Sequence, residues 1–202
     1  GQQIGHFLYV VDPVVRRIVV LNSNPMTVVT SIPQPGPTDI AMAPTLKVLA
    51  VSNFSTNQVQ FIGTDPLANG FHTVVATTPV GSAPAGVAWQ PDNEDIFVCN
   101  TLSNTVSILE GQSFKVRKTI SNQLQQPFQV ALTSRQVGFA FQTGVYFGYI
   151  LNKNGTCAIF ESGPSGLQGI GFDDLVGLIT DNFFQSTTIQ ADTTTLESGV
   201  WI

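Results

Sequence analysis

Asparagine recurs at fixed spacing along this chain, so its amide side chain is the first candidate for binding chemistry. The pattern is an Asn or Asp followed four positions later by Asn or Arg, at Asn53/Asn57, Asn100/Asn104 and Asp12/Arg16. A ring of such groups could bind a polyol or a sugar. The same residues also end strands, tolerate left-handed backbone geometry and hydrogen-bond within their own turns. A turn requirement therefore explains the recurrence as well as a ligand site does.

Carboxylates are the second candidate, because a hard cation such as Ca²⁺ needs several convergent oxygen ligands. Asp12 and Asp39 are expected near the same loops, and Asp173, Asp174 and Asp181 lie towards the end of the chain. None of them shows the dense Asp-x-Asp-x-Asp spacing of a cation-binding loop. The sequence therefore predicts no metal site.

Catalytic residues and cofactor ligands are not apparent. His6 and His72 are the only two histidines and lie in unrelated segments. A zinc or haem site needs further nitrogen or thiolate ligands nearby, and a nucleophilic serine lacks the Gly-x-Ser-x-Gly setting. Cys99 and Cys157 are interpreted as small buried residues, although they could pair if the fold brought them together. We expect no catalytic residue and no cofactor.

Composition limits the partners and the compartment. Charged residues make up 10% of the chain and the formal net charge is −5, which makes a nucleic-acid partner unexpected. No apolar run reaches the roughly 20 residues of a membrane-spanning helix. A weakly charged surface rich in Thr, Asn and Gln is common outside the cytoplasm, so we expect an extracytoplasmic protein, periplasmic, secreted or on a cell surface.

Short strands recur with a period near 40 residues. The anchors Asp12, Asn53, Asn100 and Gln142 are 41, 47 and 42 residues apart, and each follows a short apolar run. In the fourth copy, 139–142 would be the second strand and 148–151 the third. Around each anchor the pattern indicates four strands rich in β-branched and aromatic residues, a unit that cannot bury both faces alone. Radial stacking of such units gives a β-propeller.

The copies also resemble the YVTN-type β-propeller repeat. Phe97-Val98-Cys99-Asn100 and Tyr9-Val10-Val11-Asp12 stand at the signature tetrapeptide, and Pro79-Val80-Gly81 with Pro91-Asp92 match its flanks. The resemblance covers about residues 7–172 and weakens in the fourth copy. It implies an all-β, single-domain chain of about four to five four-stranded blades, roughly 7–37, 38–84, 85–126, 127–164 and 165–202.

The end of the chain decides between two arrangements. Leu175–Asn182 could be another second strand, and 198–202 could be another first strand that completes the first blade. The chain would then be a closed five-bladed ring; otherwise it is a fragment of a larger propeller. An open array leaves blade faces uncovered, so we expect a protein partner or self-association there. The apolar residues expected in that contact are Phe183, Phe184, Val200, Trp201 and Ile202.

Function is expected where loops meet on one face around the central channel. These loops are 33–38, 80–85 and 122–127, together with 12–16, 53–57, 100–104 and 142–146. The candidate ligand-binding residues on this face are Asp12, Arg16, Asp39, Asn53, Asn57, Asn100 and Asn104. The sequence favours a non-catalytic binding or assembly module. The resemblance leaves open an enzyme or enzyme subunit, similar to lactone hydrolases or periplasmic dehydrogenase subunits.

Overall fold

Antiparallel sheets account for the architecture of the computed structural model, which describes residues 6–135, 145–162, 173–180, 188–191 and 200–201. No α-helix occurs among these residues, which confirms the all-β prediction. The first sheet has three strands, the next three have four each, and a two-stranded sheet follows. The strands are β1 (Phe7–Asp12), β2 (Arg17–Asn22), β3 (Thr27–Pro33); β4 (Pro37–Met42), β5 (Val48–Asn53), β6 (Gln58–Gly63), β7 (Val74–Pro79); β8 (Pro84–Trp89), β9 (Asp95–Asn100), β10 (Thr105–Glu110), β11 (Val116–Ile120); β12 (Pro127–Leu132), β13 (Phe147–Asn152), β14 (Cys157–Glu161), β15 (Asp174–Ile179); and β16 (Gln190–Ala191), β17 (Val200–Trp201).

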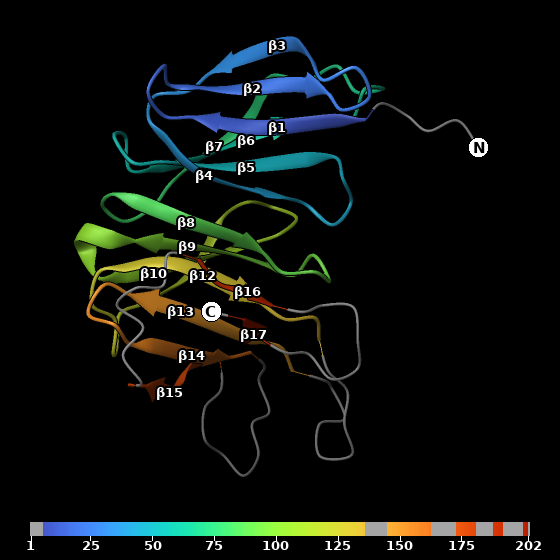
Figure 1. Ribbon diagram of the computed structural model, residues 1–202. Helices are drawn as coiled ribbons and strands as arrows, with labels where there is room; N and C mark the ends of the chain where they lie inside the picture. The colour runs from blue at the N-terminus through green and yellow to red at the C-terminus, as the bar shows by residue number, and fades with distance from the viewer. Residues whose placement is uncertain (1–5, 136–144, 163–172, 181–187, 192–199, 202) are drawn as a thin grey trace.

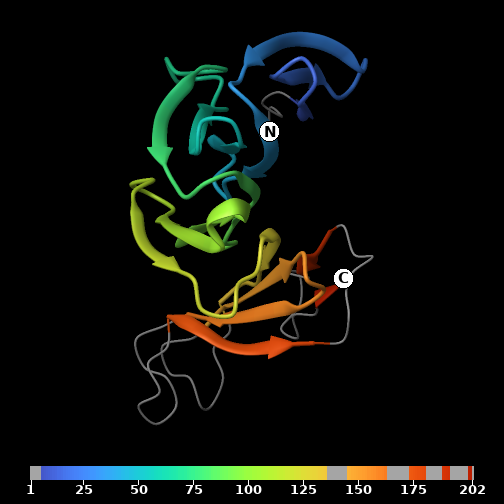
Figure 2. The same ribbon diagram turned by 90° about the vertical axis from the view of Figure 1, so that its left-hand side faces the viewer.

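The sheets stack face to face as successive blades of an open arc (Figures 1 and 2). The inner strands β4, β8 and β12 lie side by side, and the first and fourth sheets lie at opposite ends of the stack. The loops that enter each inner strand, and the turns after β1, β5, β9 and β13, share the edge on the left of Figure 1. We call this edge the channel-mouth face, and the other edge the opposite face.

Alternation of side chains explains the stacking, because each strand presents apolar residues to both neighbouring blades. In β5, Leu49 and Val51 pack towards the first blade, while Ala50 packs towards the third. In β9, Ile96 and Val98 face the second blade, and Phe97 and Cys99 face the fourth. Three core clusters therefore lie between blades rather than within them: 18/20/32/49/51/62, 43/50/59/61/87/89/96/98/109 and 97/99/106/108/120/124/130/132/146/150/158/160.

The fourth blade corrects the predicted position of its second strand. The segment 148–151, expected as a third strand, belongs to β13, which pairs with the inner strand β12 on one side and β14 on the other. Asn152 lies opposite Pro127, as Asn53 lies opposite Pro37 and Asn100 opposite Pro84. Asn152 is therefore the anchor of this repeat. The predicted anchor Gln142 and its strand 139–142 lie outside the described residues.

The end of the chain also differs from the prediction. Residues 174–179 form β15, the outer strand of the fourth sheet, and not the second strand of a fifth unit. The fourth blade therefore continues past residue 164, because its outer strand follows a long connection. β17 pairs with β16, and β16 lies beside β12. The first sheet keeps three strands, so the described residues do not form the closed five-bladed ring.

Candidate functional site

The anchor asparagines are buried, and two of them, Asn53 and Asn152, make hydrogen bonds that position the loops of the channel-mouth face. Asn53 is 0% exposed; its Oδ1 accepts a hydrogen bond from the backbone N of Gly36, and its Nδ2 donates to Gln34. Asn152 likewise accepts from the backbone N of Gln125, at 3.0 Å. Asn100 is also fully buried and donates to Thr105 and Ser107. The Asn53 and Asn152 amides therefore satisfy loop backbone that would otherwise be unpaired. Asn100 bonds only side chains, and its buried Oδ1 has no hydrogen-bond partner among the described residues.

The second asparagine of each pair connects neighbouring blades. Asn57 and Asn104 have φ of 55° and 53°, the left-handed geometry that Asn tolerates. The Oδ1 of Asn57 accepts from the backbone N of Ala83 at 2.9 Å, and that of Asn104 from Gln126 at 2.7 Å. Each of these bonds, which we call Asn straps, joins a turn to the loop that enters the next blade. The amide oxygen of each residue is thereby occupied.

Asp12 and Arg16 lie in the corresponding turn of the first blade. The Asp12 carboxylate accepts from the backbone N of Val15 and pairs with Arg17 at 3.1 Å. The Val15 hydrogen bond, more than the Arg17 charge, lowers the pKa of Asp12. Arg16 is exposed, with φ of 58°. No hydrogen bond or ion pair in the described part of the chain joins two of the seven candidate side chains, so their ligand-binding role stays a prediction.

Asp39, in the inner strand β4, hydrogen-bonds residues of the two following inner strands. Its Oδ2 accepts from the backbone N of Val87, in the next inner strand, and its side chain also hydrogen-bonds Gln129, in the one after. Burial raises the pKa of Asp39, although these hydrogen bonds oppose the shift. Gly86 stands between the two partners: a Cβ there would lie 2.6 Å from the carbonyl oxygen of Phe128. The missing side chain therefore allows β8 and β12 to approach each other closely.

The residues predicted for partner contact fall at the end of the chain. Phe183, Phe184 and Ile202 lie outside the described residues. Val200 and Trp201 form β17, whose backbone pairs with β16. Ile189, just before β16, packs on Ala131, Leu151 and Cys157 in the fourth blade, so this segment covers part of that blade's far face.

The first blade presents an apolar face at the other end of the arc, where the sequence analysis expected an uncovered blade face but named no residues. Leu8 and Val10 are 43% and 40% exposed, and Val28 is 65% exposed. Leu8 pairs with Leu21 across the sheet, Val10 with Val19, and Leu21 with Val28, so all five side chains share one surface. We call this surface, formed by Leu8, Val10, Val19, Leu21 and Val28, the open face.

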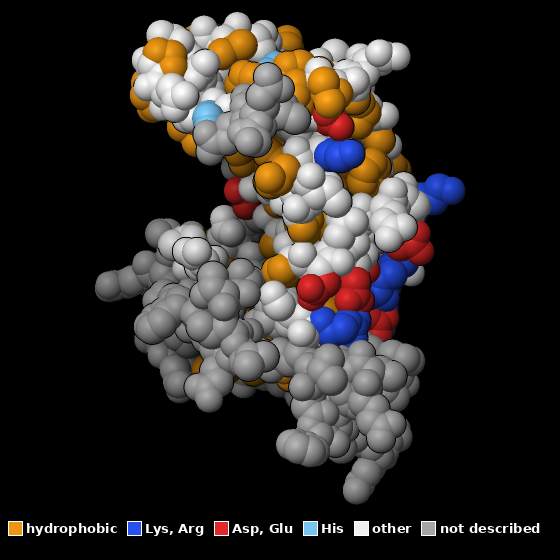
Figure 3. All heavy atoms as spheres, turned by 90° about the vertical axis from the view of Figure 1, so that its right-hand side faces the viewer, with side chains coloured by type: hydrophobic (Ala, Val, Ile, Leu, Met, Phe, Trp, Pro, Cys, Tyr) orange, Lys and Arg blue, Asp and Glu red, His pale blue; other side chains and the backbone are white. Residues whose placement is uncertain are grey.

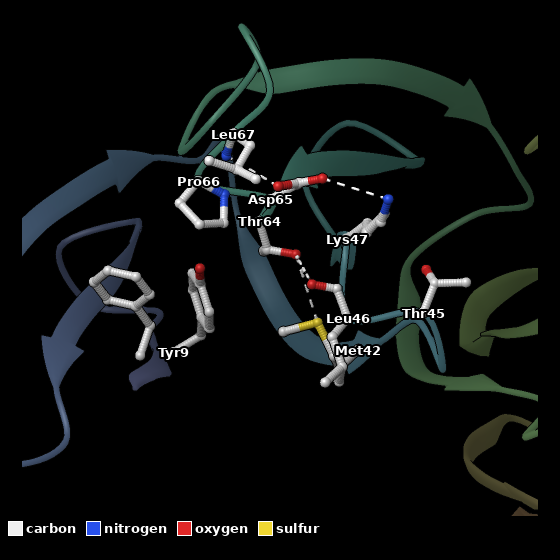
Figure 4. A pocket seen from close by; sticks show the side chains of 10 residues that line it. Tyr9, Met42, Thr45, Leu46, Lys47, Thr64, Asp65, Pro66 and Leu67 are labelled. Atoms are coloured by element: carbon white, nitrogen blue, oxygen red, sulfur yellow. Dashed lines mark hydrogen bonds and ion pairs between the residues drawn. The ribbon is translucent and has the colours of Figure 1, made fainter. Parts of the chain in front are cut away.

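A cavity of about 450 Å³ lies between the first and second blades, on the opposite face. Figure 4 shows Tyr9 on one wall, Met42 and Leu46 across from it, and Pro66 and Leu67 above. Polar groups line the same cavity at Lys47, Thr64 and Asp65, and Phe7 and Thr45 complete the lining. We call it the interblade cavity.

Two titratable groups meet at the wall of the interblade cavity. The Tyr9 hydroxyl lies 3.1 Å from Nε2 of His72, within hydrogen-bonding distance. Burial raises the pKa of Tyr9 to about 12 and lowers the pKa of His72. The His72 ring stacks on Phe71, with centroids 3.7 Å apart, and meets Phe7 edge-on. Burial thus favours the uncharged phenol of Tyr9 at the cavity wall and the uncharged imidazole of His72 behind it.

Charged side chains gather elsewhere on the opposite face, over the third and fourth blades (Figure 3). Arg117 donates to both oxygens of Asp95 at 2.7 Å and to both oxygens of Asp173 at 2.6 and 2.7 Å. The Tyr146 hydroxyl, fully buried, also donates to Asp95. Burial and the Asp95 charge raise the pKa of Tyr146, and the Asp95 hydrogen bonds raise that of Arg117. Arg135 pairs with Glu94 beside this network.

The described residues offer neither a metal-binding cluster nor a membrane-spanning helix. Within the described ranges, no group of three His, Cys, Asp or Glu side chains is arranged to hold a metal ion. No helix in that part of the chain is long and apolar enough to cross a membrane.

The comparisons with known proteins establish the fold. No family model matches the chain, and no curated protein matches it in sequence. A solved structure titled Kuenenia stuttgartiensis hydrazine synthase is similar with a TM-score of 0.66 and 12% identity, over 87% of this chain and 46% of that one. Dihydro-heme d1 dehydrogenase NirN in complex with DHE is similar with a TM-score of 0.56 and 12% identity, over 79% of this chain and 33% of that one.

This chain therefore spans less than half the length of either solved chain. Both of these neighbours contain β-propellers, which agrees with the four stacked antiparallel sheets found here. The prediction of a β-propeller, with about four blades in the described residues, is confirmed.

Proposed function

We propose that this chain is a non-catalytic assembly module of the YVTN type, acting outside the cytoplasm, whose open face docks another propeller blade. The single observation behind the proposal is the exposure of Leu8 and Val10. β1 corresponds to the second strand of the later blades, because the first sheet lacks an inner strand. Leu8 and Val10 are the second and fourth residues of β1, and the matching residues of β5 are Leu49 and Val51. These are 2% and 0% exposed, because they pack on the preceding blade.

The same positions in the later blades indicate that the partner of the open face is another blade. Ile96 and Val98 in β9 and Ile150 in β13 are all 0% exposed, each against the blade before it. The first blade thus carries residues suited to a neighbouring sheet. Covering the exposed parts of Leu8, Val10 and Val28 would stabilise a complex by about 1 kcal/mol each. The chemistry that fits is another apolar, twisted sheet face.

The unpaired edge of β1 also suits a docking blade. In the later blades the second strand is hydrogen-bonded on both sides, as β5 is to β4 and β6. β1 pairs only with β2 among the described residues, which leaves one edge available for an added strand. A docking blade that also supplied an inner strand would complete the first sheet. The low content of charged residues and the Tyr149-Ile150-Leu151-Asn152 anchor are consistent with the extracytoplasmic, YVTN-type interpretation.

In a solution of this chain alone, the docking blade would come from a second copy. Ile189 covers part of the far face of the fourth blade, and the half-buried Ile159 on the same face suits such a contact. Sedimentation equilibrium should be measured for the unchanged chain, for Leu8→Lys/Val10→Lys, and for Val14→Lys/Val15→Lys. Val14 and Val15 are 89% and 61% exposed in the β1–β2 turn, away from the open face, and serve as the matched control.

We expect the unchanged chain and the control to self-associate. The open-face variant should associate at least tenfold more weakly, a difference of about 1.4 kcal/mol. A chain that stays monomeric at the highest attainable concentration would contradict the proposal. So would equal weakening by both variants, which would assign the association to apolar surface in general.

An enzyme subunit is the second candidate, because both similar structures bear the names of enzymes. Asp39 is the carboxylate that this function would use, since it lies at the meeting point of the inner strands. Assays of lactone hydrolysis on the unchanged chain and on Asp39→Asn test it. Turnover that disappears in Asp39→Asn would favour an enzyme over an assembly module.

A further inference from the structure

We propose that the interblade cavity binds a small, flat, amphipathic anion: an aromatic ring system that carries one carboxylate or sulfonate group. This site is separate from the open face, because Phe7 and Tyr9 point from β1 towards the second blade while Leu8 and Val10 point away. The cavity volume of about 450 Å³ falls within the roughly 300–1,000 Å³ of small-molecule sites.

The walls of the cavity select a flat apolar body. Tyr9 forms one wall and Met42 lies across from it, which leaves a slot lined by an aromatic ring and a thioether (Figure 4). Pro66 bounds the slot above. Rings stack favourably on aromatic side chains, and a methionine adapts its shape to the surface that it meets.

Two exposed leucines at the cavity indicate apolar surface that a ligand would cover. Leu46 is 69% exposed and Leu67 is 82% exposed, although both belong to turns that are held in place. Leu46 has φ of 59° and its carbonyl accepts from the Thr64 hydroxyl at 2.9 Å. The backbone N of Leu67 donates to Asp65 at 3.0 Å. Both side chains are thus positioned at the cavity rather than packed into the core.

The polar groups of the cavity favour a ligand that accepts hydrogen bonds, and therefore an anion. Lys47 Nζ pairs with Asp65 at 3.5 Å, and the lysine side chain is 67% exposed. An ammonium group has three donors, and the ion pair with Asp65 occupies at most one of them. Both Asp65 oxygens are engaged, one by Lys47 and the other by Leu67. Lys47 can therefore accommodate a second carboxylate or sulfonate, whereas Asp65 has less capacity for a ligand cation.

Other groups restrict the ligand to a single negative charge. The Thr64 hydroxyl donates its hydrogen bond to the Leu46 carbonyl, and the Tyr9 hydroxyl is hydrogen-bonded to His72. Among the described residues, Lys47 is the only cationic side chain that lines the cavity. A dianion such as a phosphate monoester would lack a second positive partner here.

Two naphthalene probes test the proposal, one with a sulfonate (8-anilinonaphthalene-1-sulfonate) and one without (N-phenyl-1-naphthylamine). Binding of each is measured by fluorescence and mapped by amide chemical shifts. The variants are Lys47→Gln, which removes the charge, and Thr45→Trp, which adds bulk beside the cavity. Lys115→Gln removes an exposed lysine from the third blade and is the matched control.

We expect amide shifts at 42–47 and 64–67 with both probes. Lys47→Gln should weaken sulfonate binding about fivefold and leave the neutral probe unchanged, Thr45→Trp should weaken both, and Lys115→Gln neither. Shifts confined to the open face, equal effects of the two lysine variants, or absence of binding would each overturn the proposal. None of the three variants alters the open face, so these results are independent of the self-association test.

Discussion

Replacing Asp95 with Asn should destabilise the protein far more than its place in a turn-rich, weakly charged chain suggests. Asp95 is 5% exposed at the start of β9, and its carboxylate accepts from Arg117 and from the buried Tyr146 hydroxyl. An Asn of the same size offers one acceptor oxygen instead of two. Arg117 then loses at least one of its two hydrogen bonds to this side chain and faces an amide N–H instead, at a site from which water is largely excluded. If the amide nitrogen takes the place of Oδ2, Tyr146 loses its acceptor as well.

The size of the expected loss in stability depends on the hydrogen bonds that Arg117 keeps in the variant. Removing one partner of a fully buried ion pair costs about 3–5 kcal/mol. The Arg117 side chain is 26% exposed and keeps both hydrogen bonds to Asp173, so the cost should be smaller. We expect a loss of about 2–3 kcal/mol in the free energy of unfolding, or roughly 4–12 °C in Tm for a chain of this size.

Urea denaturation, followed by circular dichroism and by Trp fluorescence, measures this loss. Tyr146→Phe isolates the phenol hydroxyl, and the double variant with Asp95→Asn should show a clearly non-additive effect, because both changes remove one shared contact. Lys47→Gln breaks an exposed ion pair and should cost at most about 1 kcal/mol. If Asp95→Asn costs no more than Lys47→Gln, or if the two network variants are additive, the inferred coupling is wrong.

Three further changes examine the interfaces between blades. Gly86→Ala should cost about 1–3 kcal/mol in urea unfolding, since its Cβ would meet backbone atoms of the next inner strand, whereas Gly177→Ala meets only the Ile159 side chain at 3.5 Å and should cost less. Trp89→Ala should cost about 3–5 kcal/mol, because the ring is 8% exposed and packs on Phe61; a loss below about 1 kcal/mol would argue against that packing. The raised pKa of Asp39 means that the folded state holds this proton more tightly than the unfolded state, whose pKa is about 3.9. Stability from this group is therefore present below about pH 4 and lost as pH rises through the folded pKa, so Asp39→Asn should flatten that decline, and identical pH profiles would exclude the effect.

The second and third blades could be predicted from the sequence because local chemistry specifies them. Each inner strand begins with proline, each second strand ends in Asn53 or Asn100, and side chains alternate between the two blade interfaces. Short strands with paired apolar faces leave few other arrangements. The fourth blade was misassigned because spacing is a weaker guide than pairing: its anchor Asn152 is 52 residues after Asn100, and loop length adds little thermodynamic cost.

The charged network and the interblade cavity could not be predicted in the same way. Asp95 meets Tyr146 and Arg117 meets Asp173 only because the third and fourth blades lie side by side. No periodicity links residues so far apart in the chain. Asp95 alone is conspicuous in the sequence, as an acidic residue followed directly by four apolar strand residues. The open face was hidden for a related reason: Leu8 and Val10 look like any other strand residues until their matching positions are found buried.

The Asn straps have a consequence for how such a protein can change over evolution. Asn57 holds the loop before β8 and Asn104 holds the loop before β12, so every strap joins adjacent repeats only. A duplicated segment would carry its own asparagine and its own receiving loop, and would be accepted between existing repeats without compensating changes elsewhere. In repeat proteins the stability of an array is close to a sum of such neighbouring terms. Gain or loss of a whole repeat by recombination would therefore leave the straps of the other repeats in place, whereas a substitution at Asn57 or Asn104 removes one of them.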